Sequence, residues 1–255
     1  QVGGNDDLLF DGNSLAAWPD GQVVIAPAWQ EGVLMIDLDD PSSCEWIASD
    51  ASDALHVGQD TLRFVGPDSD GREHEREVLE DLADAVVTGL SDYCRKSGIT
   101  SIVLGLSGGI DSAAAACVAA AAVGPEHVTG LAMPSRHSSQ HSIDDAAHTA
   151  NALGLVFETI AIDSMHRSVE SSIGEMLQDG APVAGENLQA RLRGLIVMAH
   201  ANAQGSMAIA TGNKSELAQG YCTLYGDMAG GYTPLGDLYK MQVYGLAEVF
   251  NRRAV

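Results

Sequence analysis

Short apolar runs alternate with longer segments of helical periodicity between residues 101 and 210. Strands are expected at Ser101 to Leu106, His127 to Met133, Leu155 to Ile162 and Met207 to Ala210, and helices at about 111–123, 143–153, 164–177 and 186–203. Strands that alternate with helices predict a parallel sheet covered on both faces by crossover helices. Ligands of such sheets bind at the carboxyl ends of the strands. We therefore expect an α/β fold with its site at one edge of the sheet.

The first 65 residues have a different pattern. Short apolar runs separated by Gly, Pro and Asp predict a small β-rich region, with strands near Leu8 to Phe10, Val23 to Ile25 and Val33 to Leu38. Residues 66–72 are polar and turn-rich, which favours a linker. Helical spacing from Val78 to Tyr93 then predicts a long helix that Gly98 ends. We predict a β-rich region at 1–65, a linker at 66–72 and the α/β domain over 73–255.

Composition excludes some classes of function. The chain has 35 acidic and 13 basic residues, a formal net charge of −22, so a generic nucleic-acid-binding surface is disfavoured. To bind an anionic ligand, the protein would need local N–H groups, arginines or a metal that offset the repulsion from its net negative charge. The four cysteines are scattered without a CxxC pair, which favours inert thiols. Neither an apolar run of ~18 residues nor a signal peptide is visible, so we expect a cytoplasmic protein without membrane contact.

The stretch SIVLGLSGGIDSAAAACVAA, residues 101–120, admits two chemistries. Its GLSGG matches the G-x-S-x-G nucleophile elbow of serine hydrolases, but the last histidine is His200 and no HGGG-type oxyanion loop is present. Alternatively, Gly108 and Gly109 let the backbone approach a phosphate at a helix N-terminus. A Walker A lysine is absent, whereas Asp111 suits Mg²⁺. The phosphate interpretation is favoured over both the elbow and a simple capped turn.

SGGIDS is similar to the SGGxDS signature of the PP-loop ATP pyrophosphatases, which split ATP between its α and β phosphates. Three later stretches resemble the synthetase domain of glutamine-dependent NAD synthetases: MPSRHSSQHSIDDA, ENLQARLRG and TGNKSELAQGYCTLYGDMAGGYTPLGDLYK. This resemblance runs from about Glu73 to the chain end and implies a Rossmann-like PP-loop domain of the adenine nucleotide alpha hydrolase type. The family's last helix continues beyond Val255, so we expect a C-terminally truncated synthetase domain in a piece of a longer protein.

Residues 1–65 resemble the C-terminal tail of a nitrilase-like amidase domain, with QVGGNDDLLFDGNS matching its closing strands. In the family, that domain releases ammonia from glutamine. The family's catalytic Cys, Glu and Lys would lie upstream of Gln1, and Cys44 does not replace them. Glutaminase activity is therefore not expected of the chain itself.

The resemblance implies that deamido-NAD is amidated to NAD through an acyl-adenylate, with ATP and Mg²⁺ as cofactors and ammonia supplied by an upstream glutaminase domain. ATP would contact Gly105, Leu106, Ser107, Gly108, Gly109, Ile110, Asp111, Ser112, Arg136, Thr211 and Lys240. Asp111 and Glu216 would be the catalytic residues and hold the metal. The dinucleotide would contact Asn187, Arg191, Arg193, Glu216, Tyr225 and Asp227. The family also implies a homo-oligomer.

Two alternatives stay open. Another PP-loop enzyme, of the amidotransferase or tRNA-modifying type, shares the loop; a tRNA-modifying member should show a basic patch or catalytic cysteines. A nucleotide-binding module could instead sense ATP without turning it over. Release of pyrophosphate and AMP with deamido-NAD and ammonium separates these hypotheses.

Overall fold

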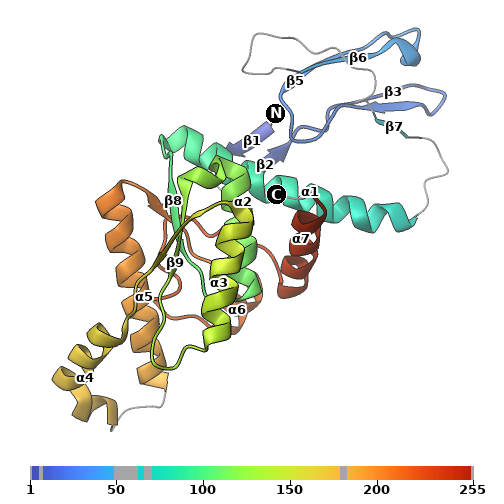
Figure 1. Cartoon of the computed structure of the whole chain (residues 1–255). Helices are drawn as coiled ribbons and strands as arrows, with labels where there is room; N and C mark the ends of the chain where they lie inside the picture. Colours follow the sequence, from blue (N-terminus) through green and yellow to red (C-terminus); the bar gives the residue numbers. More distant parts are fainter. Residues whose placement is uncertain (1, 6–7, 49–62, 66–70, 179–182, 254–255) are drawn as a thin grey trace. The chain divides into compact units, whose positions relative to one another are not determined.

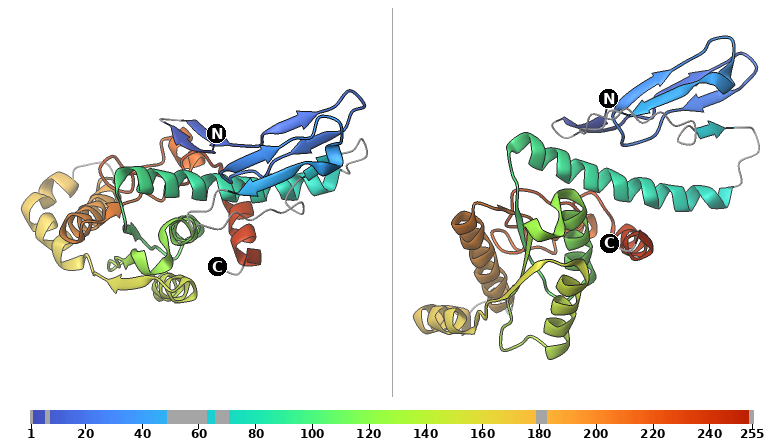
Figure 2. Two further views of the ribbon diagram at one scale, coloured as in Figure 1. Left: turned by 90° about the horizontal axis from the view of Figure 1, so that it is seen from above. Right: turned by 45° about the horizontal axis from the view of Figure 1, so that its top comes forward.

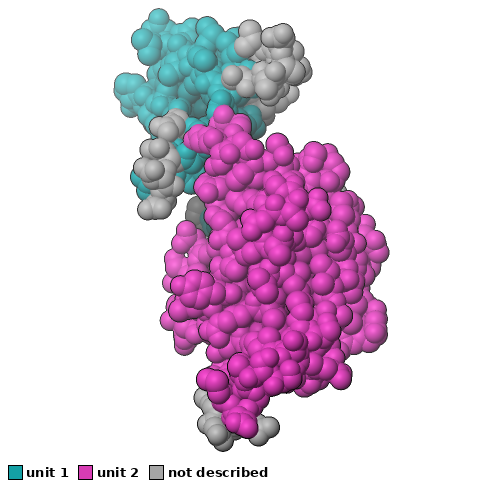
Figure 3. Space-filling view, turned by 90° about the vertical axis from the view of Figure 1, so that its left-hand side faces the viewer, with its two compact units in different colours: residues 1–92 teal, residues 93–255 magenta. Residues whose placement is uncertain are grey.

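The computed structural model describes residues 2–5, 8–48, 63–65, 71–178 and 183–253 (Figure 1). The chain divides into two compact units, residues 1–92 and 93–255, which Figure 3 colours separately. Helix α1 (Gly71–Ser97) carries the chain from the first unit into the second. Most of the predicted linker, residues 66–70, lies outside the described residues, and the domain boundaries at 65 and 73 stay a prediction.

Unit 1 contains short antiparallel strands. The pairs are β1 (Val2–Asn5) with β2 (Leu8–Asp11), β4 (Val23–Ile25) with both β3 (Leu15–Ala17) and β7 (Arg63–Val65), and β5 (Gly32–Met35) with β6 (Glu45–Ala48). A 3₁₀ turn, η1 (Pro41–Ser43), precedes β6. Val24, Ala26, Cys44 and Trp46 form a small buried cluster. The predicted β-rich region is confirmed.

Among the described residues, unit 2 contains a parallel sheet of four strands in the order β10-β9-β8-β11. The bounds are β8 (Ile102–Gly105), β9 (Val128–Ala132), β10 (Val156–Thr159) and β11 (Met207–Ala208). Ile102 of the central strand aligns with Val128 on one side and Met207 on the other. Because such a strand is covered on both faces, its residues form a continuous apolar run. Ile102, Val103 and Leu104 are accordingly all fully buried.

Helices cover both faces of this sheet (Figures 1 and 2). Helices α2 (Ile110–Val123) and α3 (Gln140–Leu153) contact one face, and α5 (Val183–Gln204) contacts the other. α4 (Asp163–Gln178) packs on α5, and α7 (Lys240–Arg253) packs on α2. A 3₁₀ turn, η3 (Pro125–His127), follows α2, and α6 (Lys214–Gln219) follows β11. The α/β prediction is confirmed, and no helix in the described part of the chain is long and apolar enough to cross a bilayer.

Helix α3 begins three residues earlier than the hydrophobic pattern predicts. Its N-cap is Ser139, whose Oγ accepts a hydrogen bond of 3.1 Å from the Ser142 amide. The cap oxygen satisfies one of the first-turn amides that have no carbonyl partner within the helix. Ser139 can do so because it directly precedes the first helical residue, Gln140. Gly154 ends the helix with φ of +73°, where a residue without Cβ is favoured.

Candidate functional site

The loop from Ser107 to Ser112 joins β8 to α2 and is held by its own hydroxyls. Ser112 is buried, and its Oγ accepts from the Ser107 amide at 3.2 Å and donates to the Gly109 carbonyl at 2.9 Å. The Ser107 Oγ lies 3.1 Å from that of Ser112 and accepts from the Gly109 amide at 3.2 Å. No hydrogen bond in the described part of the chain joins Ser107 to a histidine, as an activated serine nucleophile would require. The geometry therefore favours an anion-binding loop.

Gly108 is required at its position for two reasons. Its φ of +82° lies in the left-handed region, and a Cβ there would come within 2.4 Å of the Ser142 carbonyl oxygen. The loop thus packs directly against the backbone of the first turn of α3. Gly109 is different, because its φ is −87° and its Cβ would meet only the Ser107 hydroxyl, at 3.3 Å. Its lack of a side chain leaves the N-terminus of α2 open to a ligand.

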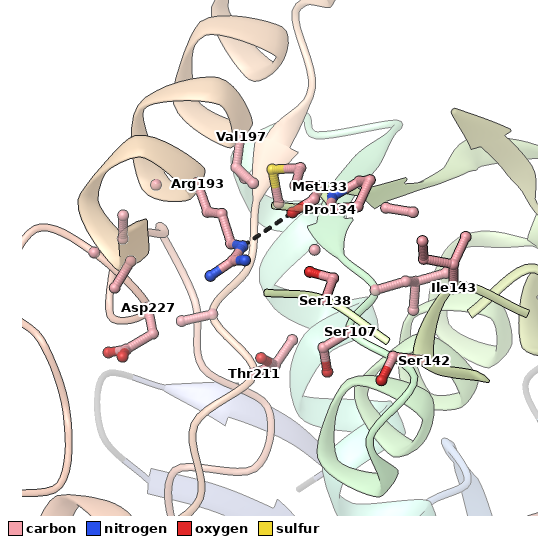
Figure 4. A pocket seen from close by; sticks show the side chains of 18 of the residues that line it. Ser107, Met133, Pro134, Ser138, Ser142, Ile143, Arg193, Val197, Thr211 and Asp227 are labelled. Carbon is pink, nitrogen blue, oxygen red and sulfur yellow. Dashed lines mark hydrogen bonds between the residues drawn. The ribbon is translucent and has the colours of Figure 1, made fainter. Parts of the chain in front are cut away.

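A cavity of about 570 Å³ opens beside this loop. It lies at the carboxyl ends of strands β8, β9 and β11, beside the loops that follow them, as expected for a parallel sheet. Figure 4 shows side chains from these loops and from α5 around one space. The lining includes the predicted residues Gly105, Leu106, Ser107, Arg193, Thr211 and Asp227. Its volume is within the usual range for small-molecule sites.

Arg193 contributes a positive charge to the cavity wall. Its Nε donates to the Met133 carbonyl at 3.1 Å, which orients the guanidinium (Figure 4). Burial lowers the pKa of Arg193, but an arginine side chain stays protonated in proteins. Its other N–H groups are the donors that a phosphate or a polar ring edge needs.

Asn187 and Asp227 are brought together through Thr223. The Thr223 hydroxyl donates to the Asn187 Oδ1 at 2.8 Å, and the Asp227 Oδ1 accepts from the Thr223 amide at 2.8 Å. This network ties helix α5 to the loop that follows α6. Two of the predicted dinucleotide contacts therefore belong to one connected group beside the cavity.

Asp111 and Glu216, the two predicted metal ligands, both hydrogen-bond to Asn213. The Asn213 Nδ2 donates to the Asp111 Oδ1 at 3.0 Å, and the Asn213 amide donates to the Glu216 Oε2 at 3.0 Å. Lys240 forms an ion pair with the second oxygen of Asp111. No cluster of three or more His, Cys, Asp or Glu side chains that could hold a metal occurs among the described residues. A cation here would have two protein carboxylates, which suits Mg²⁺ because it completes its shell with phosphates and water.

Several predicted residues lie apart from the cavity wall, among them Arg136, Arg191 and Tyr225. Arg136 donates to Asp163 at 2.6 Å and to Glu170 at 3.1 Å, so its guanidinium fastens the loop after β9 to α4. Arg191 is exposed and donates to the Leu224 carbonyl at 3.2 Å. Tyr225 is 86% exposed, with φ of +61°. Their roles toward ATP and the dinucleotide stay predictions.

Sequence reasoning missed two groups of residues. Polar residues after β9 line the cavity: His137, Ser138, Ser139 and Ser142. The sequence does indicate these residues, since a polar run directly follows an apolar strand, but only Arg136 was proposed from that run. Asn213 was also missed, although N-K-S-E has an N-cap residue with Glu three positions later, the pattern of a capping box. The structure contains that capping box.

Comparisons with known proteins identify the family of the chain. A family model described as NAD synthase matches residues 82–254. A glutamine-dependent NAD(+) synthetase from Rhodobacter capsulatus is 46% identical over 245 residues, 95% of this chain and 41% of that protein. One from Synechocystis is 42% identical, covering 99% and 42%. The solved Acinetobacter baumannii enzyme in complex with ADP is 35% identical with a TM-score of 0.80, covering 99% and 44%. The chain thus spans less than half the length of these relatives.

Proposed function

The chain belongs to the NAD synthase family, and from this premise we propose that it carries the synthetase domain of a glutamine-dependent NAD synthetase. The proposed reaction is the ATP-dependent amidation of deamido-NAD to NAD. One observation carries the proposal: Ser107, the first residue of SGGIDS, lines a cavity of about 570 Å³ in a chain that the family model matches from residue 82 to 254. The relatives' names supply the substrate class.

ATP would bind in the cavity with its phosphates at the Ser107–Ser112 loop. Support comes from the loop's free helix N-terminus and from the relative solved with ADP. Gly109, the N-cap residue of α2, has no side chain that could cap the helix, so amides of the first turn remain available as donors. Thr211 lies at the cavity and offers a hydroxyl, and Lys240 offers a cation beside Asp111.

The proposed chemistry has two steps. The carboxylate of the nicotinate ring attacks the α-phosphorus of ATP, which forms a mixed anhydride and breaks the bond to pyrophosphate. Ammonia then attacks the carbonyl carbon, AMP leaves, and the ammonium proton goes to solvent or a nearby base. Neither step needs a protein nucleophile, so the protein acts through charge stabilisation and positioning.

Mg²⁺ would be held by Asp111 and Glu216. Both are hard oxygen ligands, and both approach one residue, Asn213, so the donor set fits the ion. When bound, Mg²⁺ would neutralise charge on the departing pyrophosphate. In that role Asp111 would give up its ion pair with Lys240, and the ammonium group of Lys240 would then be available to a phosphate oxygen.

The dinucleotide would contact Asn187, Arg191, Arg193, Tyr225 and Asp227. The Asn187–Thr223–Asp227 network and the buried guanidinium of Arg193 support this assignment. We also infer, from the family's names, that ammonia comes from a glutaminase domain upstream. Assembly as a homo-oligomer and a cytoplasmic location complete the proposal.

The test measures pyrophosphate and AMP with ATP, Mg²⁺, deamido-NAD and ammonium. We expect both products and NAD in equal amounts. ATP binding without pyrophosphate release would favour a sensor instead. Asp111→Asn should abolish the reaction, whereas Glu126→Gln, an exposed acid at the opposite end of α2, should leave it unchanged. Full turnover by Asp111→Asn would refute the metal assignment.

A further inference from the structure

Asn213 is completely buried at the site, with 0% of its surface exposed. A buried amide must satisfy its donors and acceptor, and here the partners are the two carboxylates of the proposed metal site and the helix that carries one of them. Asn213 is 102 residues from Asp111 in sequence. It therefore links the loop after β8 with the start of α6.

The orientation of the Asn213 amide is fixed by its partners. The Glu216 N–H can only donate, so the side-chain oxygen of Asn213 must face it, at 3.0 Å. The Asp111 carboxylate can only accept, so the side-chain NH₂ must face it, also at 3.0 Å. Flipping the amide would break both bonds. Asn213 thus sets the relative positions of Asp111 and the first turn of α6.

The Asn213 main chain holds the second carboxylate. Its amide donates to the Glu216 Oε2 at 3.0 Å, completing the capping box. Each carboxylate keeps its other lone pairs, because an ionised carboxylate has about four acceptor positions. The bonds from Asn213 therefore orient the two side chains without using up their capacity to bind a cation.

We propose that Asn213 is a positioning residue that holds Asp111 and Glu216 in register for a divalent cation bound with the nucleotide. The inference rests on the proposed function for the identity of the metal site. It goes beyond that function by assigning the role to a residue that touches neither substrate. Outer partners of metal ligands commonly change metal affinity by ~10–100-fold.

Serine separates this role from simple helix capping. Asn213→Ser keeps a side-chain oxygen for the Glu216 amide, because serine caps helices about as well as asparagine. It removes only the donor to Asp111. Asn213→Ala removes both contacts. Val128→Ala, at the amino end of β9, is a matched control that destabilises a buried position away from the site.

The experiment measures the affinity for ATP by calorimetry, with Mg²⁺ and with a chelator, in the absence of deamido-NAD. We expect wild type and Val128→Ala to bind ATP more tightly with Mg²⁺. In Asn213→Ser, the ATP affinity measured with chelator should stay within about 2-fold of the wild type. The increase in ATP affinity that Mg²⁺ causes should be smaller by ~10-fold. Its melting temperature should stay closer to wild type than that of Asn213→Ala.

Two results would overturn the proposal. One is an unchanged gain from Mg²⁺ in Asn213→Ser, which would make Asn213 a helix cap and nothing more. The other is a wild type whose ATP affinity does not respond to Mg²⁺ at all. Failure of the proposed function is seen separately, as normal Mg²⁺-dependent ATP binding without NAD formation when deamido-NAD and ammonium are added.

Discussion

Replacing Gly108 with alanine should destabilise unit 2, although the change adds a single methyl group. The residue has φ of +82°, and the new Cβ would lie 2.4 Å from the Ser142 carbonyl oxygen. Neither side of this contact can shift easily, because Gly108 lies in a tight loop and Ser142 belongs to the backbone of helix α3. Either the loop or the first turn of α3 must move.

The magnitude follows from two contributions. A left-handed backbone costs an L-residue about 1–2 kcal/mol, and forcing an extra methyl group into a packed site costs about 1–3 kcal/mol. A total of about 3 kcal/mol corresponds to a fall of roughly 6–12 °C in melting temperature for a chain of this size. ATP affinity should fall as well, because the displaced loop carries the phosphate donors.

Gly109→Ala is the matched control. Its φ of −87° suits any residue, and its Cβ meets only a hydroxyl at 3.3 Å, so stability should change by less than about 1 kcal/mol. Helical circular dichroism should be followed, because Trp18, Trp29 and Trp46, the chain's three tryptophans, all lie in unit 1 and fluorescence would report on that unit. Equal melting temperatures for the two variants would refute the steric reasoning.

Three further predictions concern the cavity, the metal and a partly buried thiol. Arg193→Ala should weaken binding of deamido-NAD by roughly 10–100-fold, the effect of losing one hydrogen bond to a charged group, whereas Arg191→Ala should weaken it less than about 3-fold; an effect of Arg193→Ala on ATP alone would contradict the assignment of Arg193 to the dinucleotide. Glu216→Gln should reduce the gain in ATP affinity from Mg²⁺ while leaving the affinity with chelator nearly unchanged, and calorimetry showing an equal loss in both conditions would argue against metal binding. Burial raises the pKa of the Cys117 thiol to about 11, so the unfolded chain ionises first as pH rises and this thiol's contribution to stability is lost above about pH 9. The melting temperature of Cys117→Ala should therefore decline less between pH 9 and 11 than that of the wild type. Cys117 should also resist iodoacetamide at pH 8 until urea unfolds the protein; rapid labelling of the folded protein would show that the thiol is accessible.

Local patterns predicted most of the fold. The run at Ile102–Gly105 is recognisable as a buried strand because four consecutive residues lack polar side chains, and helices α3 and α4 show the period of an amphipathic helix. The start of α3 was predicted less well. Ser138, Ser139 and Ser142 all stand near this start, and which of them becomes the N-cap depends on where the preceding loop leaves the sheet.

The motifs also named much of the site. Ser107, Arg193, Thr211 and Asp227 line one cavity, as expected for polar residues that follow parallel strands or face their ends. Arg136 shows the limit of this reasoning. Its pairing with Asp163 and Glu170 depends on where α4 lies relative to the loop after β9, which no pattern around Arg136 reports.

The sequence by itself determined the α/β class, because periodicity, capping and turn chemistry act between residues a few positions apart. The phosphate loop and the two carboxylates were proposed from motifs that resemble those of a family, and they stay predictions. Only the tertiary structure decided that Asn213 joins Asp111 to Glu216, and that Gly108 must fit against the Ser142 carbonyl. Those contacts depend on strand order and on how α2, α3 and α6 meet at the end of the sheet. That arrangement is set by the packing of the whole unit, which stretches of sequence do not encode one at a time.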